Sequence, residues 1–223
     1  MTGDAVHLNR AAIEALAKDQ RVALINSLTG FKAACLVGTV DATGRSNLAI
    51  FNSAVHIGTS PPLIGLILRP DSVPRHTLDN IRSQRVYTLN HVREDWLAAA
   101  HQTSARYARD ESEFDATGLT PEYWDNFKAP AVGEALVRIG LTLREELAIR
   151  CNGTHLLIGE VMRVELPDAA LLGDMALDAA AAGSIAVSGL NTYYRAQRIA
   201  QLPYARRSEP TSSSGIDSTQ VSR

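Results

Sequence analysis

Cysteine and aromatic residues are scarce in this 223-residue chain, which has two cysteines and 5% aromatic residues. Cys35 and Cys151 lie far apart and form no Cys-x-x-Cys pair, which disfavours a disulfide framework and a cysteine-based zinc site. Both have apolar or bulky neighbours, so we expect both thiols to be buried and inert. The six histidines include no His-x-x-x-His pair, and we expect no metal site.

An excess of charge of either sign is also missing. Lysine and arginine number 22 and aspartate and glutamate 24, for a net charge of −2. A nucleic-acid partner would call for a basic excess, so we expect none. No apolar run approaches the roughly 20 residues of a membrane span, and we expect no membrane partner. The first ten residues are charged and unlike a signal peptide, which predicts a cytoplasmic protein.

The sequence contains no Gly-x-Gly-x-x-Gly, P-loop or Gly-x-Ser-x-Gly motif, so the commonest nucleotide-binding and hydrolase signatures are absent. Short apolar or alternating runs instead predict an antiparallel, mostly β fold with helices, in the form of a small barrel. The expected strands are 33–40, 47–57, 63–68, 85–92, 134–150, 155–166 and 185–187. The expected helices are one or two within 10–28, then 77–81, 94–107 and part of 168–182.

Three regions follow from this pattern. Residues 1–30 are expected to form a helical segment that packs on the barrel, and residues 31–206 the barrel domain. Residues 207–223 are rich in Ser and Thr and have few bulky aliphatic residues. Such a segment cannot bury enough surface to offset its ordering entropy, so we expect a disordered tail.

A polar segment before a predicted helix carries the sharpest functional signal. Arg69, Ser72, Arg75, His76 and Thr77 lie within nine residues around the helix start. A helix start favours an anion, arginine suits phosphate, and hydroxyl groups add neutral donors. The segment therefore predicts a phosphate site. A solvated loop before an ordinary capped helix is the alternative, and the segment by itself leaves the two equally open.

A second signal lies in the strand from Asn47 to Ser53, which carries Asn47, Asn52 and Ser53 among apolar neighbours. Amide and hydroxyl groups could hydrogen-bond the edge of a flat heteroaromatic ring. Capping of the strand ends by the same polar groups is the alternative, and the spacing alone favours it.

Together these segments resemble the flavin reductase-like, FMN-binding split-barrel family, over residues of about 25–206. The motifs that carry the resemblance are, in order, Asn47-Leu48-Ala49 with Ser53, Ser60-Pro61-Pro62-Leu63, Arg69 through Ile81, Tyr87-Thr88-Leu89-Asn90, Ser112-Glu113-Phe114, Gly118-Leu119-Thr120 and Leu157-Ile158-Gly159-Glu160-Val161.

The resemblance implies a homodimeric, Greek-key antiparallel split barrel with helical decoration, which holds FMN near the subunit interface. It assigns the phosphate to the loop of Arg69, Ser72, Arg75, His76 and Thr77. It assigns the flavin ring and ribityl chain to Asn47, Leu48, Ala49, Ile50, Phe51, Asn52, Ser53 and Asn90. The chain departs from many members at Asn52, and at Arg75-His76-Thr77, where Lys-Asp-Thr is frequent.

The activity implied is that of a flavin reductase, in which NADH or NADPH passes a hydride to flavin N5. A flavin-dependent monooxygenase or another acceptor would then take the electrons. Similarity places His155 on the nicotinamide side, although an ordinary strand-end histidine is the alternative. His101 and Thr103 are candidates for the ribityl chain, and Tyr193 and Tyr194 for ring stacking or, more simply, packing. A non-catalytic FMN-binding electron carrier or flavin-storage protein is the alternative function.

Overall fold

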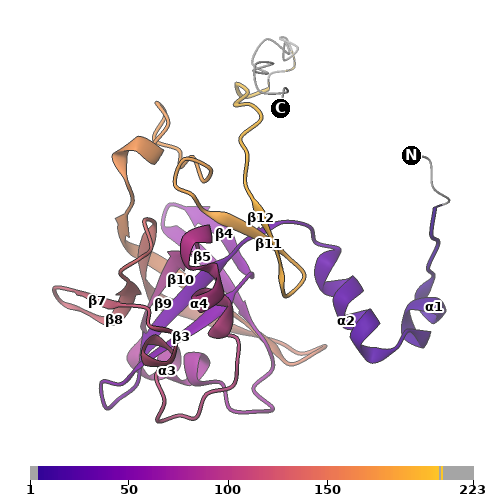
Figure 1. The fold of residues 1–223 in the computed structure, drawn as a ribbon, viewed down its shortest axis with the longest axis horizontal. Coiled ribbons are helices and arrows are strands. Elements are labelled where there is room, and N and C mark those ends of the chain that lie inside the picture. The colour runs from indigo at the N-terminus through magenta and orange to yellow at the C-terminus, as the bar shows by residue number, and fades with distance from the viewer. Residues whose placement is uncertain (1–4, 206, 208–223) are drawn as a thin grey trace.

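A curled antiparallel sheet forms the centre of the computed structural model, which describes residues 5–205 and 207 (Figure 1). Its strand order is β3-β2-β6-β9-β10-β5-β4, and every neighbouring pair is antiparallel. These strands are β2 (Cys35–Val40), β3 (Ser46–Phe51), β4 (Ala54–Thr59), β5 (Pro62–Leu68), β6 (Val86–His91), β9 (Arg138–Ile149) and β10 (Thr154–Glu165). The structure confirms the predicted antiparallel β fold with few helices.

The two edge strands of this sheet follow each other in the chain. Only Asn52 and Ser53 separate the end of β3 from the start of β4. Because so short a link joins opposite edges, the sheet must curl until the end of β3 lies close to the start of β4, which gives it the form of an open barrel. The prediction of a single strand over 47–57 is therefore wrong. Strand β3 ends at Phe51, and β4 begins at Ala54 on the opposite edge of the sheet.

Two smaller sheets extend the barrel. A three-stranded sheet has the order β1-β11-β12, and a hairpin pairs β7 with β8. Their bounds are β1 (Lys32–Ala33), β11 (Ile185–Ser188), β12 (Thr192–Arg195), β7 (Pro121–Trp124) and β8 (Phe127–Val132). The sequence did not predict β7, β8 or β12, because these short strands show no clear apolar alternation.

Helices cover the barrel at only a few places. They are α1 (Arg10–Ala15), α2 (Lys18–Ser27), α3 (His76–Gln84), α4 (Leu97–Gln102) and α5 (Glu113–Thr117), with short 3-10 turns η1 (Glu94–Trp96) and η2 (Asp168–Ala170). Of the helix predicted within 168–182, only η2 is helical. The rest of this Ala-rich stretch forms turns. Asp168 and Asp178 accept hydrogen bonds there from backbone N–H groups that follow them, Asp168 through its carbonyl and Asp178 through its carbonyl and its side chain.

The N-terminal helices α1 and α2 stand beside the barrel rather than on it (Figure 1). Neither contains a buried residue. In this single chain the two helices therefore do not pack on the barrel as the sequence led us to expect. Of the tail predicted to be disordered, only Arg207 is described, so that prediction falls on residues outside the described part.

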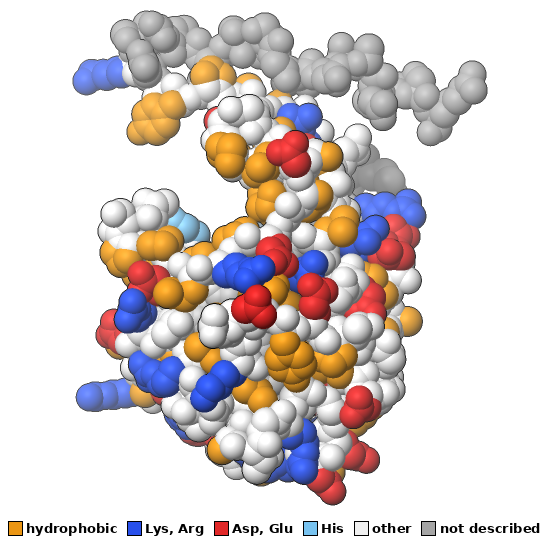
Figure 2. Space-filling model, turned by 90° about the vertical axis from the view of Figure 1, so that its left-hand side faces the viewer, with side chains coloured by type: hydrophobic (Ala, Val, Ile, Leu, Met, Phe, Trp, Pro, Cys, Tyr) orange, Lys and Arg blue, Asp and Glu red, His pale blue; other side chains and the backbone are white. Residues whose placement is uncertain are grey.

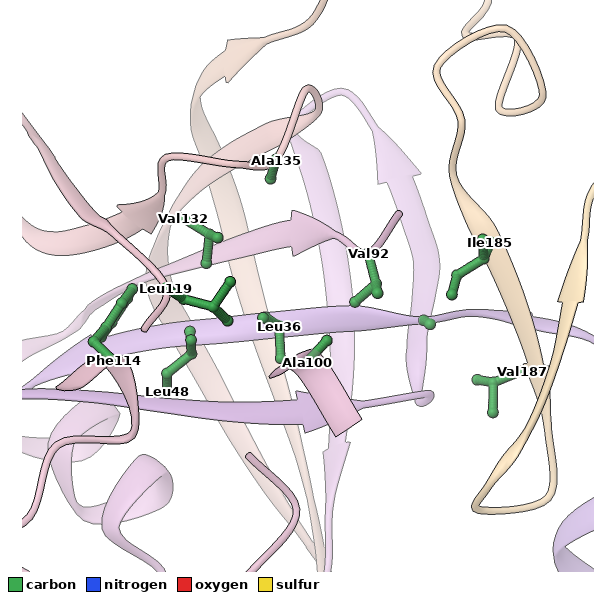
Figure 3. Packing of buried hydrophobic residues seen from close by; sticks show 11 residues of the cluster. Leu36, Leu48, Val92, Ala100, Phe114, Leu119, Val132, Ala135, Ile185 and Val187 are labelled. Carbon is green, nitrogen blue, oxygen red and sulfur yellow. The ribbon is translucent and has the colours of Figure 1, made fainter. Parts of the chain in front are cut away.

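The core lies on both faces of β2. Leu36 joins Leu48, Val92 and Phe114 on one face (Figure 3). Cys35 and Val37 point to the opposite cluster inside the barrel, which the apolar face of α3 also enters. Since successive strand residues face opposite sides, a strand covered on both faces is buried along its whole length and mostly apolar, as β2 is. Burial of this kind fixes β2 and α3, and with them the loop that precedes α3.

Candidate functional site

The loop from Arg69 to Arg75 joins the end of β5 to the start of α3. Leu78 and Ile81 are fully buried and fix the helix against the barrel. The loop itself is largely exposed, which leaves its side chains and the first N–H groups of α3 free to meet a ligand. The predicted polar segment at a helix start is therefore present in the structure.

The donors of this loop are only partly used within the protein. Among the described residues, the Arg69 guanidinium and the Ser72 hydroxyl make no hydrogen bond or ion pair with another side chain or with the backbone. Arg75 donates through Nε to the Pro70 carbonyl at 3.1 Å, which leaves its two Nη groups for a ligand. An anion at this helix start would meet cationic and neutral donors together.

Thr77 lies in the first turn of α3 and is held by a buried amide side chain. Asn47 donates through Nδ2 to Thr77 Oγ1 and to Thr39 Oγ1, each at 3.2 Å, and Asn80 donates to Thr39 at 3.1 Å. Since Thr77 Oγ1 accepts in this buried network, its own proton remains available to a ligand. Asn47 thus links β3 to the helix start and positions Thr77.

His76, by contrast, is half-buried beside a small polar hollow of about 10 Å³. Asp41, Arg45, Asn80 and Arg109 line the same hollow, which has room for about one water molecule. Its place in the phosphate site stays a prediction.

The β3–β4 junction lies next to this loop. Ser53 donates through Oγ to the Ile67 carbonyl at 2.6 Å, and its own carbonyl accepts from the Ile67 N–H at 3.3 Å. Asn52 donates through Nδ2 to the Gly189 carbonyl at 2.7 Å. Ile67 is two residues from Arg69, so the structure brings the two predicted segments together on one side of the barrel.

At this junction the side chains of Asn52 and Ser53 are committed to backbone carbonyls, but their N–H groups are not. Among the described residues neither N–H has a hydrogen-bond partner. The edge of a planar ring would therefore meet backbone donors here rather than the amide and hydroxyl groups that the sequence indicated.

Several predicted ring-contact residues lie inside the protein. Leu48 is fully buried in the core (Figure 3), while Ile50 and Phe51 pack against the two core clusters. Asn90 is also fully buried; its amide donates to the Leu36 carbonyl at 3.0 Å and accepts from the Val132 N–H at 3.0 Å. In this structure Leu48 and Asn90 are structural residues, because no exposed atom remains for a ligand. Ala49 is half-buried in the same strand.

A buried carboxylate holds the middle of β3. Glu113 accepts a hydrogen bond from the Leu48 N–H through Oε2 at 2.9 Å. Burial raises the pKa of Glu113 above its ordinary value, although its backbone hydrogen bonds act in the opposite direction. Ser112-Glu113-Phe114 is one of the motifs that carry the family resemblance, but the sequence did not predict this contact.

His155 lies in a cluster of ionisable side chains that the sequence did not predict. Its Nδ1 is 2.8 Å from Glu146 Oε1, and its Nε2 is 3.5 Å from Asp71 Oδ2. Arg82 holds Glu146 through two contacts of 2.6 and 3.0 Å and lies 3.2 Å from Asp71. Hydrogen bonding to Arg82 lowers the pKa of both Glu146 and Asp71. We call Asp71, Arg82, Glu146 and His155 the charged cluster.

The remaining candidates make contacts within the protein, and their part in a flavin site stays a prediction. His101 Nδ1 lies 2.8 Å from the Tyr193 hydroxyl, Thr103 donates to the Ala100 carbonyl at 2.8 Å, and Tyr194 packs on Phe31 with ring centroids 4.5 Å apart. The contacts of Tyr193 and Tyr194 join the β11–β12 hairpin to α4 and to Phe31, which precedes β1.

The two cysteines differ. Cys35 is buried, and burial raises its pKa to about 12, in agreement with an inert thiol. Cys151 is exposed, so the expectation that it is buried is wrong. It lies in the turn between β9 and β10, where the backbone turns at the surface.

Positive and negative side chains are interspersed with apolar ones on the face shown in Figure 2. Within residues 5–205 and 207, His, Cys, Asp and Glu form no group of three or more that could hold a metal ion. Each helix in that part of the chain is too short or too polar to cross a bilayer.

Comparison with known proteins assigns the family. The family described as "Flavin reductase like domain" matches residues 29–180. A Shewanella frigidimarina structure described as a "putative flavin reductase with split barrel domain" is 46% identical, and the match covers 90% of this chain and 100% of that chain with a TM-score of 0.87.

Two more distant structures share the fold. They are nitrilotriacetate monooxygenase component B from Bacillus cereus and flavoredoxin from Desulfovibrio vulgaris, with 20% and 24% identity and TM-scores of 0.76 and 0.66. The alignments cover 88% and 76% of this chain and 98% and 88% of theirs. With a polar loop at the start of α3, a curled antiparallel sheet and a family match over more than half its length, the chain belongs to the flavin reductase-like family of split-barrel proteins.

Proposed function

We propose that this protein binds FMN and catalyses hydride transfer from NADH or NADPH to it, after which the reduced flavin passes electrons to an acceptor. One observation carries the proposal. A loop with two arginines and two hydroxyl groups, Arg69 to Thr77, opens α3 directly beside the β3–β4 junction, where two backbone N–H groups are unpaired among the described residues. A phosphate monoester attached to a flat ring matches this pair of sites.

The phosphate end is assigned to Arg69, Ser72, Arg75 and Thr77. The two guanidinium groups supply permanent positive charge and planar donors, which suit phosphate oxygens. The N–H groups at the start of α3 add aligned dipoles. This donor set favours FMN over riboflavin, which offers no anion.

We assign the flavin ring to the site at Asn52 and Ser53, because their backbone N–H groups can donate hydrogen bonds to acceptors on the edge of a heteroaromatic ring. When bound, the flavin supplies a two-electron acceptor. The contribution of the chain would be to hold that ring against the nicotinamide at a fixed distance and angle, which lowers the barrier to hydride transfer. No protein acid or base is required for that step, and none is proposed.

We also propose that His155 lies on the nicotinamide side. Its side chain is buried, and both ring nitrogens face carboxylates, Glu146 and Asp71. We therefore assign it a positioning role and no proton transfer.

A homodimer is proposed from the outer face of the sheet. Val55, Ile67 and Leu147 are about 40% exposed, at 42%, 39% and 43%. A Cβ at Gly65 would touch Val55, Ile57 and Leu156, so these apolar residues form one surface across β4, β5 and β10. A contiguous apolar surface beside the proposed ring site would be covered by a second copy of the chain. We name Val55, Ile57, Ile67, Leu147 and Leu156 the outer apolar face.

For the acceptor we propose a second protein, for example a flavin-dependent monooxygenase in the cytoplasm. Among proteins of the same fold, one is named as a monooxygenase component and another as a flavoredoxin. A reductase and an electron carrier are the two functions to be separated.

Anaerobic reduction separates them. Protein reconstituted with FMN should keep the flavin through gel filtration, and NADH or NADPH should bleach its visible absorption with a hyperbolic dependence on nucleotide concentration. Failure to retain flavin would contradict the proposed cofactor. Retained flavin that dithionite reduces and neither nucleotide reduces would establish the carrier.

A further inference from the structure

The proposed phosphate loop contains a residue of the wrong charge. Asp71 lies between Arg69 and Ser72, both assigned to the phosphate, and its side chain is exposed. A carboxylate in that place would repel a phosphate dianion and lower its affinity. The loop favours an anion more strongly if this charge is neutralised or turned away.

The charged cluster supplies the neutralising group. Arg82 Nη1 lies 3.2 Å from Asp71 Oδ2, while the other two nitrogens of the same guanidinium hold Glu146 of β9. His155 Nε2 approaches the same Asp71 oxygen at 3.5 Å. Arg82 is thus held by two elements, its own helix α3 and strand β9, and its partner Asp71 lies in the exposed loop.

We propose that Arg82 is a positioning residue that draws Asp71 away from the anion and cancels its charge, with the His155 ring beside the same carboxylate, so that the loop discriminates in favour of a phosphate-bearing flavin. The inference rests on the proposed function, because it assumes a phosphate at this loop. Arg82 itself need not touch the ligand, since its three outer nitrogens already face Asp71 and Glu146.

Glu146 has a defined part in this arrangement. It receives two hydrogen bonds from Arg82 and one contact from His155 Nδ1 at 2.8 Å. Planar guanidinium and carboxylate groups bound through two contacts have a fixed mutual orientation. This fixed orientation presents the third nitrogen of Arg82 to Asp71.

The test compares the dissociation constants of FMN and riboflavin for four proteins: the full chain, Arg82→Met, Asp71→Asn and Arg82→Met/Asp71→Asn. We expect Arg82→Met to weaken FMN about tenfold, as one uncompensated charge close to the phosphate would do, and to leave riboflavin unchanged. Asp71→Asn should leave FMN affinity equal or higher. The double variant should recover most of the loss, which a merely structural role of Arg82 would not produce.

Ionic strength gives an independent readout. Repulsion between Asp71 and the phosphate is screened by salt, so the defect of Arg82→Met should shrink as salt concentration rises. Arg144→Met is the matched control, because Arg144 also pairs with a glutamate across β9 and β10, namely Glu160, but outside the charged cluster. It should bind both flavins as the unchanged protein does.

Three results would overturn the inference. One is an Arg82→Met variant that keeps the preference for FMN. Another is an equal loss of FMN and riboflavin, and the third is a double variant no better than Arg82→Met. If Arg82→Met does not fold, a specific loss of FMN affinity in Asp71→Asn contradicts the inference, since Asp71 would then be needed by the site. A full-length protein that binds FMN no more tightly than riboflavin would instead remove the proposed phosphate site itself.

Discussion

Gly159 leaves the space that the side chain of Tyr87 fills. A Cβ atom on Gly159 would overlap the Tyr87 hydroxyl, and it would lie only 2.9 Å from Cζ of the same ring. Tyr87 is fully buried, its hydroxyl has no hydrogen-bond partner within the described residues, and burial raises its pKa. A glycine in β10 is therefore required by close packing across the barrel, and the unpaired hydroxyl is a local cost.

This relationship predicts opposite effects of two substitutions. Gly159→Ala should destabilise the protein by about 2 kcal/mol, because the overlap forces the core to shift. Tyr87→Phe should be neutral or stabilising by up to about 1 kcal/mol, since it removes a buried group without a partner. Denaturant unfolding of both variants and of the double variant measures the coupling. The double variant should be more stable than the sum of the single effects predicts; strict additivity would show that the two residues do not compete for space.

Phosphate recognition can be tested at Arg75. Arg75→Ala should weaken FMN about tenfold or more and leave riboflavin affinity almost unchanged, because a charge-assisted hydrogen bond typically contributes ~1.5–3 kcal/mol and only FMN has the anion. Titration by flavin fluorescence measures both constants. Arg106→Ala, at an exposed arginine elsewhere in the chain, is the control. An equal loss for both flavins would remove Arg75 from the phosphate site.

Glu113 predicts a pH dependence of stability. Its pKa is raised in the folded protein, so the folded state binds the proton more tightly than the unfolded state does. The stabilisation from the protonated form is complete below the ordinary glutamate pKa and is lost as the pH rises from there through the raised value. Glu113→Gln keeps an oxygen for the Leu48 N–H and removes this titration.

Unfolding curves across that pH range should therefore show the gap between the two proteins changing in favour of Glu113→Gln as pH rises. A constant gap over the whole range would mean that Glu113 titrates as an ordinary glutamate.

The outer apolar face predicts an obligate contact between copies. Sedimentation at micromolar concentration should give about twice the 24.0 kDa chain mass. Ile67→Glu should shift the protein to the monomer, because a charge buried at an interface without a partner is costly. Leu136→Glu, at an apolar side chain that is 41% exposed outside this face, is the control. A flavin-loaded monomer of the unchanged protein would contradict the homodimer.

His155→Ala tests the nicotinamide side. At saturating FMN, the anaerobic rate of reduction by NADH should fall, because the loss of the imidazole disturbs orientation rather than a proton transfer. Stopped-flow absorption measures the rate, with dithionite reduction as the check that the flavin is intact. An unchanged rate would remove His155 from this role and leave the activity in place.

The sequence by itself determined the antiparallel β class, the polar loop from Arg69 to Thr77 and the strand from Asn47 onward, because apolar alternation and loop composition are local properties. It also identified the family, since several short motifs in a fixed order are specific where each alone is weak. The sequence could not predict properties that depend on contacts between residues far apart in the chain.

Tertiary structure decided those properties. The expected strand 47–57 is interrupted at Asn52 and Ser53, because these two residues join strands on opposite edges of the sheet. Tertiary structure placed Asn90 inside the core, where an amide is paired with backbone groups of two other strands. It also brought Asp71, Arg82, Glu146 and His155 together from a loop, a helix and two strands. Charges so far apart in sequence acquire a joint effect only when the folded barrel sets the distances between them, since electrostatic interaction depends on separation in space.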